Sequence, residues 1–131
     1  MRTIKFRLWC KSGSGNFKLI DNNSTRHWKL EELTAEGGIL MQYTGIKDKN
    51  GIEIYEGDII VKGRYDRKDT TYPTNIFIVF WNNNRCAFNL ISKNAYPSQH
   101  LHTDQHPHLL ITQQDKYEVI GNVYENPDLL K

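Results

Sequence analysis

The chain has 131 residues, a formal net charge of +2 and two cysteines. A chain of this length can bury a core without a metal or a disulfide, so we expect one domain over residues 1–131. The small net charge argues against a dedicated nucleic-acid-binding domain, and the 11% aromatic content excludes a globally disordered chain.

The N-terminal segment predicts a β-hairpin. Thr3–Cys10 alternates between a mainly apolar face and a second face that carries Lys5, Arg7 and Trp9, which is typical of a half-buried strand. The loop "KSGSGN" then leads to a second strand at Phe17–Ile20. The segment lacks the apolar stretch and the cleavage site of a secretory signal, so we expect reduced thiols in the cytoplasm of a host bacterial cell and no membrane partner.

The rest of the chain predicts further short strands and at most one short helix. The helix is expected over Trp28–Glu36, where two leucines lie three residues apart and two glycines follow. The expected strands are Ile39–Thr44, Ile52–Tyr55, Ile59–Gly63, Ile76–Trp81, Arg85–Ile91 and Tyr117–Pro127. Ile76–Trp81 and Arg85–Ile91 are expected to pair as a hairpin.

Two turns in the middle of the chain have specific sequence signals. Asn50-Gly51 favours a two-residue type I′ hairpin turn, in which both residues take positive φ. Glu56-Gly57-Asp58 predicts a sharp bend, because Gly57 tolerates conformations that a Cβ disfavours and Asp58 can accept a nearby backbone N–H. We therefore interpret Asn50, Gly51, Glu56, Gly57 and Asp58 as structural turn residues.

Seven or eight short strands joined by turns rich in Gly and Asn are typical of a small all-β domain. We expect a mainly β fold: a small barrel or a strongly bent antiparallel sheet with an N-terminal hairpin.

Three parts of the chain resemble one known family. The central part combines "QYTG", "KDKNG" and "IYEGDI" between Gln42 and Ile59, and we call these residues the central motif. The opening "IKFRLW" and the closing "VIGNVYENPDLL", Val119–Leu130, follow the same family pattern. In this order the segments resemble the YopX family of phage and prophage proteins.

This resemblance implies a compact, mainly β domain from a mobile element and implies no catalytic activity. The segments Lys11–Gly38 and Ser92–Asp115 follow no pattern of the family. Any specificity that depends on those two segments is therefore not carried over.

Acidic residues gather in the central motif: Asp48, Glu53, Glu56 and Asp58. Such residues can hold a divalent cation or act as an acid–base pair. Their spacing does not fit a calcium-binding EF-hand loop. We favour a structural role, because Asp residues in turns usually accept hydrogen bonds from their own backbone.

Four histidines lie close together in the weakly patterned segment: His100, His102, His106 and His108. Four imidazoles can bind Zn²⁺ or Ni²⁺, or titrate together as a pH-sensitive loop. The favoured interpretation is a polar surface loop, because a His-rich tract is compositional evidence alone.

Basic and aromatic residues interleave in two places. One is Lys5–Trp9, and the other is Arg64, Tyr65, Arg67 and Lys68. This mixture on a small barrel is suited to single-stranded nucleic acid, through stacking and phosphate contacts. We favour ordinary strand patterning next to a solvated loop, because Asp66 and Asp69 dilute the positive potential of this segment.

No nucleophilic site is predicted. Cys86 is expected to be a buried, inert thiol within a hairpin strand, and Cys10 lies at a strand end. The sequence has no phosphate-binding loop and no nucleophile elbow, so we expect no catalytic residue and no cofactor.

The sequence therefore favours a phage or prophage accessory protein that acts as a non-enzymatic binding module. A nucleic-acid-binding small β-barrel and a homo-oligomeric or host-protein adaptor are the alternatives.

Overall fold

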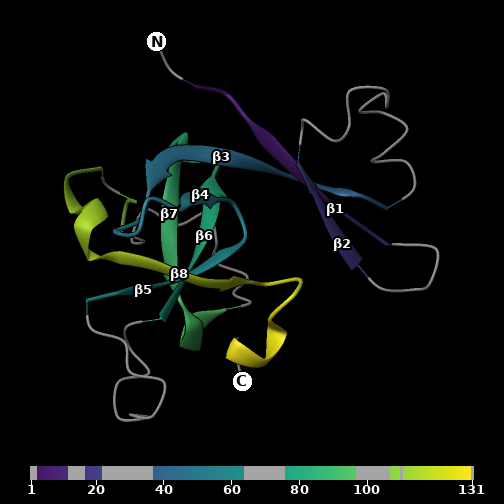
Figure 1. Ribbon diagram of the computed structural model, residues 1–131. Coiled ribbons are helices and arrows are strands. Elements are labelled where there is room, and N and C mark those ends of the chain that lie inside the picture. Colours follow the sequence, from purple (N-terminus) through teal and green to yellow (C-terminus); the bar gives the residue numbers. More distant parts are fainter. Residues whose placement is uncertain are drawn as a thin grey trace.

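The computed structural model describes residues 3–11, 17–21, 37–63, 76–96, 107–109 and 111–130. These residues form eight strands, three short 3₁₀ helices and two four-stranded antiparallel sheets (Figure 1). The expectation of a mainly β protein with an N-terminal hairpin is confirmed. The helix expected over Trp28–Glu36 lies outside the described residues.

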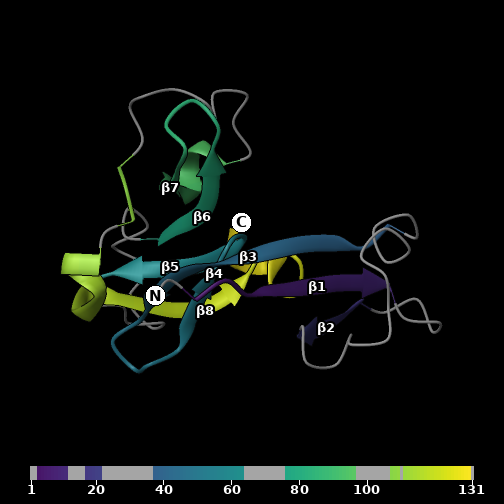
Figure 2. The same cartoon turned by 90° about the horizontal axis from the view of Figure 1, so that it is seen from above.

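The first sheet has the strand order β2-β1-β3-β4. Its strands are β1 (Phe6–Lys11), β2 (Phe17–Asp21), β3 (Ile39–Lys47) and β4 (Glu53–Tyr55). β1 pairs with β2 as the expected hairpin and with β3 on its other side. In Figures 1 and 2, β1 and β2 extend to one side, while β3 continues to the second sheet.

The second sheet has the order β7-β6-β5-β8. Its strands are β5 (Asp58–Lys62), β6 (Ile76–Asn82), β7 (Ala87–Ser92) and β8 (Tyr117–Asn122). The 3₁₀ helices are η2 (Lys93–Ala95), η3 (Ile111–Lys116) and η4 (Pro127–Leu130).

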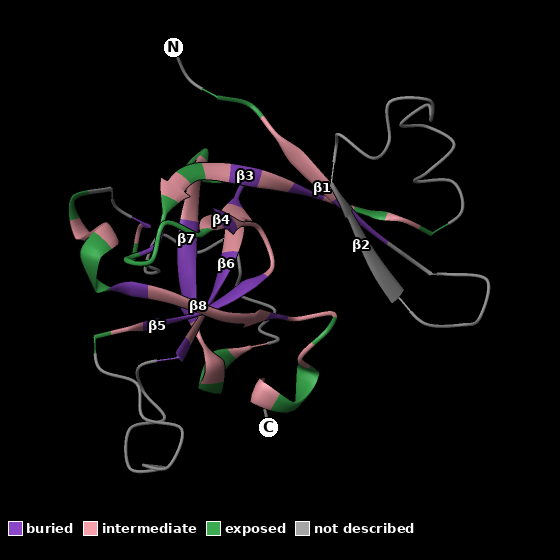
Figure 3. Cartoon of the chain, in the orientation of Figure 1, coloured by how far each residue is buried: buried purple, intermediate pink, exposed green. Residues whose placement is uncertain are grey.

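The hydrophobic core covers both faces of this second sheet. On one face Ile60, Val79 and Leu90 pack with Ile54 of β4. On the other face Ile59, Val61, Ile76, Ile78 and Ile91 pack with apolar residues from outside the sheet, including Tyr96 after η2 and Leu129 and Leu130 of η4. Consecutive side chains of a strand point to opposite faces, which explains why Ile59–Val61 is an unbroken apolar run (Figure 3).

The expectation of a small barrel or a strongly bent sheet is wrong. Within the described residues, β2 and β4 are open edges of the first sheet, and β7 and β8 end the second. A barrel needs a continuous ladder between such edges. Here the chain passes between the sheets through the tight turn after β4, and scattered hydrogen bonds join the two sheets instead.

The turn at Asn50-Gly51 differs from the type I′ expectation. Gly51 has a φ of +81°, but the backbone of Asn50 stays at negative φ. The N–H of Gly51 donates to the carbonyl of Asp48 and the N–H of Asp48 donates to that of Ile52. This pattern defines a three-residue loop with a type I turn and a left-handed glycine, so only Gly51 needs its special conformation.

The β6–β7 hairpin is present, but Cys86 is not inside its second strand. Cys86 lies in the four-residue connection between Asn82 and Ala87, where it is exposed and takes a φ of +48°. The prediction of a buried thiol is therefore wrong, because β7 begins only at Ala87.

We expect Gly51→Ala to lower the free energy of unfolding by about 1–2 kcal/mol, the cost of a left-handed conformation for a residue with a Cβ. Nothing lies within 4 Å of the added methyl, so the effect isolates backbone strain. Asn50→Ala is the matched control and should change stability by less than about 0.5 kcal/mol. Urea unfolding measures the free energy of unfolding of both variants. Equal losses of stability would contradict the three-residue loop and support the type I′ turn.

Candidate functional site

The turn at Glu56 and Gly57 is where the chain leaves the first sheet and enters the second. Gly57 has a φ of +81° and donates its N–H to the carbonyl of Val79 in β6 over 2.8 Å. Its own carbonyl accepts the N–H of Val123, which follows β8, over 2.9 Å. One glycine therefore connects the turn with two other segments, and its positive φ explains why glycine occupies the position.

Glu56 fixes the other side of the same turn. Its N–H donates to the carbonyl of Gln42 in β3, and the N–H of Gln42 donates back to Glu56 Oε1 over 2.9 Å. Glu56 does not take a left-handed backbone conformation, and one of its two carboxylate oxygens accepts this hydrogen bond. Burial raises the pKa of its carboxyl, and the hydrogen bond from Gln42 opposes that rise.

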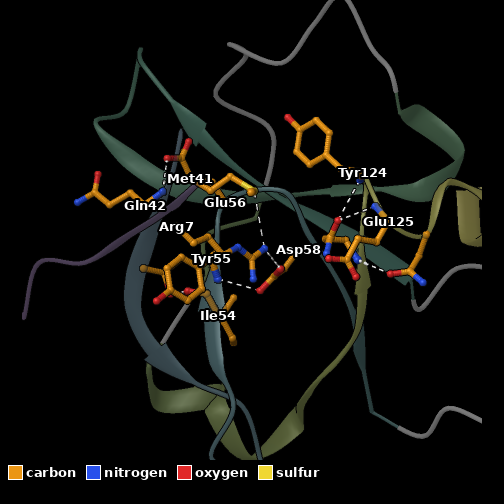
Figure 4. Close-up of polar contacts among 12 residues, drawn as sticks. Arg7, Met41, Gln42, Ile54, Tyr55, Glu56, Asp58, Tyr124 and Glu125 are labelled. Carbon is orange, nitrogen blue, oxygen red and sulfur yellow. Dashed lines mark hydrogen bonds and ion pairs between the residues drawn. The ribbon is translucent and has the colours of Figure 1, made fainter. Parts of the chain in front are cut away.

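Asp58, the next residue, forms an ion pair across the two sheets. Its carboxylate accepts hydrogen bonds from the guanidinium of Arg7 in β1 and from the N–H of Tyr55 (Figure 4). The Arg7 guanidinium also lies 4.5 Å from the centre of the Tyr55 ring, which is within cation–π range. Asp58 is 1% exposed, so this charge is held almost entirely by the protein.

Burial raises the pKa of Asp58 from 3.8 to about 6. The charge of Arg7 and the hydrogen bonds from Tyr55 and Arg7 lower it, but the loss of hydration outweighs them. The hydration that Asp58 loses therefore offsets the attraction of Arg7, so the ion pair adds little net stability, although the loss of one partner would leave a buried charge unpaired.

A second buried carboxylate, Asp48, also connects the sheets. Its Oδ1 accepts the N–H groups of Asn50 and Ile52 within the loop, at 2.8 and 2.9 Å. Its Oδ2 accepts the N–H of Val119 in β8 over 2.9 Å. Asp48 is 2% exposed, and three backbone donors replace the water that its carboxylate loses.

The rest of the central motif shapes the end of β3. Gly45 has a φ of +86° at an irregularity between the Tyr43↔Tyr55 and Lys47↔Glu53 pairs. The hydroxyl of Thr44 donates to the carbonyl of Ile54 and accepts the N–H of Ile46. Thr44 and Gly45 thus satisfy a β-bulge, which lets β3 curve towards the second sheet.

The closing motif forms a compact turn after β8. The side chain of Asn122 accepts the N–H groups of Tyr124 and Glu125, and the side chain of Asn126 accepts the N–H of Asn122. A Cβ on Gly121 would lie 2.5 Å from Asn126 Oδ1, so glycine leaves room for that side chain. This network sets the position of Tyr124 (Figure 4).

A pocket of about 270 Å³ lies next to the Glu56–Gly57 turn, between the start of β3, the end of β6 and the turn after β8. Six of its lining residues are aromatic, sulfur-containing or charged: Met41, Glu56, Phe80, Trp81, Tyr96 and Tyr124. Glu56 is the one charged residue among the described residues that line it.

The pocket wall around Tyr124 is closely packed, and the ionisable groups in it are acidic. The ring of Tyr124 stacks on that of Trp9, with 5.8 Å between the ring centres. Burial raises the pKa of the Tyr124 phenol, and the nearby Tyr96 phenol and Glu56 carboxylate raise it further. Among the described residues that line the pocket, none is cationic.

The structure answers part of the nucleic-acid hypothesis. Arg7 is committed to Asp58, and Trp9 is 3% exposed, so neither side chain is available to a nucleic acid. Lys5 pairs with Glu53 over 2.8 Å. Arg64, Tyr65, Arg67 and Lys68 lie outside the described residues.

One of the four clustered histidines is described. His108 lies beside β7, where Asn89 Nδ2 and His108 Nδ1 are 2.9 Å apart. The backbone N–H of Asn84 donates to Asn82 Oδ1, which leaves Asn82 Nδ2 to donate to Asn89 Oδ1. The Asn89 amide is thereby oriented with its nitrogen towards His108, and an amide nitrogen can only donate. His108 Nδ1 is therefore an acceptor in a structural chain, while His100, His102 and His106 lie outside the described residues.

Across the described ranges, no three His, Cys, Asp or Glu side chains are grouped so as to hold a metal ion. No helix in those ranges has the length and apolar character needed to cross a membrane.

Sequence reasoning missed most of the pocket. Tyr124 belongs to the closing motif, which was a usable signal. Tyr96 lies in a segment without pattern, and Met41 and Phe80 look like ordinary strand residues. Only the fold brings them together.

The fold and the site define a two-sheet antiparallel β protein with an aromatic pocket at the junction of its sheets. The sequence matches the family described as "YopX protein" over residues 5–131, so the chain belongs to the YopX family.

A comparison with curated proteins gives no match. Among solved structures, the chain is similar to the crystal structure of protein EF1440 from Enterococcus faecalis. The sequences are 23% identical, the likeness covers 100% of both chains, and the TM-score is 0.54. At this identity the likeness shows the fold alone.

The Asp58 carboxyl should titrate near pH 6, as measured from its ¹³C chemical shift. Because its folded pKa lies above 3.8, its contribution to stability is fully present below about pH 3.8 and is lost as the pH rises through about 6. Arg7→Met should move this pKa further upward, because it removes a charge and a hydrogen bond that favour the carboxylate.

Lys5→Met is the control, because Lys5 pairs with Glu53 and should leave the Asp58 titration unchanged. An ordinary pKa for Asp58 in the wild-type chain would contradict the buried pair, whether or not Arg7→Met folds.

Asp48→Asn should lower the free energy of unfolding by about 1–3 kcal/mol, the cost of a buried backbone donor without an acceptor. The amide nitrogen of Asn cannot accept, so either Val119 or the loop N–H groups lose their partner. Asp115→Asn, at an exposed position, should be neutral. Urea unfolding that shows equal stability for both variants would overturn the role of Asp48 as a connection between the sheets.

Proposed function

We propose that this YopX-family chain is a non-enzymatic binding module, an accessory protein of a phage or prophage, whose ligand site is the pocket beside the Glu56–Gly57 turn. The association with a mobile element follows the family resemblance. The pocket carries the binding proposal, because it combines a cavity of about 270 Å³ with aromatic walls and one carboxylate.

The wall chemistry supports binding over catalysis. The described lining residues include no histidine, cysteine, serine or lysine, which are common nucleophiles, and the groups beside Glu56 that carry a transferable proton are the phenols of Tyr96 and Tyr124. A lone carboxylate with an acceptor role towards Gln42 orients a ligand more readily than it performs chemistry.

The acidic residues of the central motif support the same view. Asp48 and Asp58 are occupied by backbone donors and by Arg7, which leaves Glu56 as the acidic residue of this set that lines the pocket. The motif therefore acts as a frame for the pocket, and the ligand meets the side chains around it.

A titration with a fragment set of neutral, anionic and cationic members, followed by ¹H–¹⁵N NMR, tests this proposal. Ile39 lines the pocket and is 38% exposed, so Ile39→Trp should narrow the opening without disturbing the core. Ile52→Trp is the matched control, at a residue that is 49% exposed and does not line the pocket.

We expect at least one fragment to shift the amides of Gly57 and Val123 in the wild type and in Ile52→Trp, with at least tenfold weaker binding to Ile39→Trp. Fragments that bind all three proteins equally, or that shift no pocket amide, would refute the site.

A further inference from the structure

We infer that the occupant of the pocket is the cationic side chain, lysine or arginine, of a partner polypeptide. This inference rests on the proposed function and specifies its ligand.

No described residue that lines the pocket carries a positive charge that could balance Glu56. Glu56 is the charged residue of the lining, and its Oε1 accepts the N–H of Gln42. No described residue donates to its Oε2. Arg7 in β1 binds Asp58, Lys5 just before β1 binds Glu53, and Lys49 binds Glu118, so these three cations are paired elsewhere. A cationic ligand would supply the positive partner for the Glu56 carboxylate.

The walls favour a cation over a neutral apolar group. Phe80, Trp81, Tyr96 and Tyr124 contribute aromatic rings, and rings attract cations through their quadrupole. The Sδ of Met41 also borders the site and already accepts from the guanidinium of Arg7 over 3.8 Å. Burial raises the pKa of the Glu56 carboxyl and of the neutral Tyr124 phenol, so both groups lie in partly dehydrated surroundings.

The size favours a side chain over a whole small molecule. The pocket, at about 270 Å³, lies just below the range of about 300–1,000 Å³ in which drug-sized ligands are usually bound. Ile39 at the opening gives an apolar contact for the aliphatic stem of a long side chain. A single lysine or arginine places its stem on such a surface and its charge beside the carboxylate.

The test uses three short peptides, acetyl-Gly-Lys-Gly-amide, its Nε-acetyl-lysine counterpart and acetyl-Gly-Arg-Gly-amide, titrated into the full chain and followed by ¹H–¹⁵N NMR. Acetylation keeps the stem and removes the charge, so it isolates the cation in wild-type protein. We expect the lysine and arginine peptides to shift the Gly57 and Val123 amides, and acetyl-lysine to bind at least tenfold more weakly.

Glu56→Gln should weaken the binding of the lysine and arginine peptides at least tenfold. The new side chain can still accept the N–H of Gln42 but carries no charge. Glu125→Gln is the matched control, since Glu125 is exposed beside Tyr124 and does not line the pocket, and it should change affinity by less than twofold.

Equal binding of the acetyl-lysine peptide at the pocket amides would overturn the cationic ligand and leave the binding module intact. The absence of any pocket shift with all three peptides would also overturn the inference, while the fragment titration decides separately whether the pocket binds. The acetyl-lysine comparison needs no variant, so it holds even if Glu56→Gln does not fold.

Discussion

The ion pair between Arg7 and Asp58 is the constraint around which the two sheets are arranged. Arg7 belongs to β1 of the first sheet and Asp58 begins β5 of the second. A carboxylate that is 1% exposed has to be placed against its partner, because an unpaired buried charge costs several kcal/mol. Few relative positions of the sheets satisfy that requirement.

The residues around the pair make this position compatible with the backbone. Gly57 turns the chain at positive φ and bonds to β6 and to the segment after β8. Asp48 repeats the same device at the other end of β4, by holding a loop of the first sheet against Val119 of the second. The pocket is the space left between these connections, so its aromatic walls are positioned by the fold before any ligand arrives.

Local features of the fold could be predicted from the sequence. Alternation located the strands, Gly57 located the bend, and turn chemistry located the β1–β2, β3–β4 and β6–β7 hairpins, because each of these depends on neighbouring residues. The type I′ turn predicted at Asn50-Gly51 was wrong, because the same dipeptide also fits a three-residue loop. The hydrogen bonds of Asp48 favour that loop here. The prediction of a buried Cys86 was wrong for a related reason. The connection between β6 and β7 is longer than the run of asparagines indicated, so Cys86 lies in it.

The arrangement of the sheets and the pocket could not be predicted in this way. Arg7 and Asp58 lie 51 positions apart, and neither periodicity nor spacing shows that they meet. The barrel expectation failed at the same level, since short strands and glycine turns suit open and closed sheets alike. Tyr96 and Tyr124 come from distant segments, and only the packed structure places them on one cavity.

The Arg7–Asp58 ion pair and the hydrogen bonds of Gly57 and Asp48 hold the two sheets in one fixed relative orientation. Backbone residual dipolar couplings in a weakly aligned sample test it most directly. Couplings from β1, β3 and β4 and those from β5, β6, β7 and β8 should fit one common alignment tensor with the structure in Figure 2. Two tensors of different magnitude or direction would show that the sheets move independently and would contradict the account.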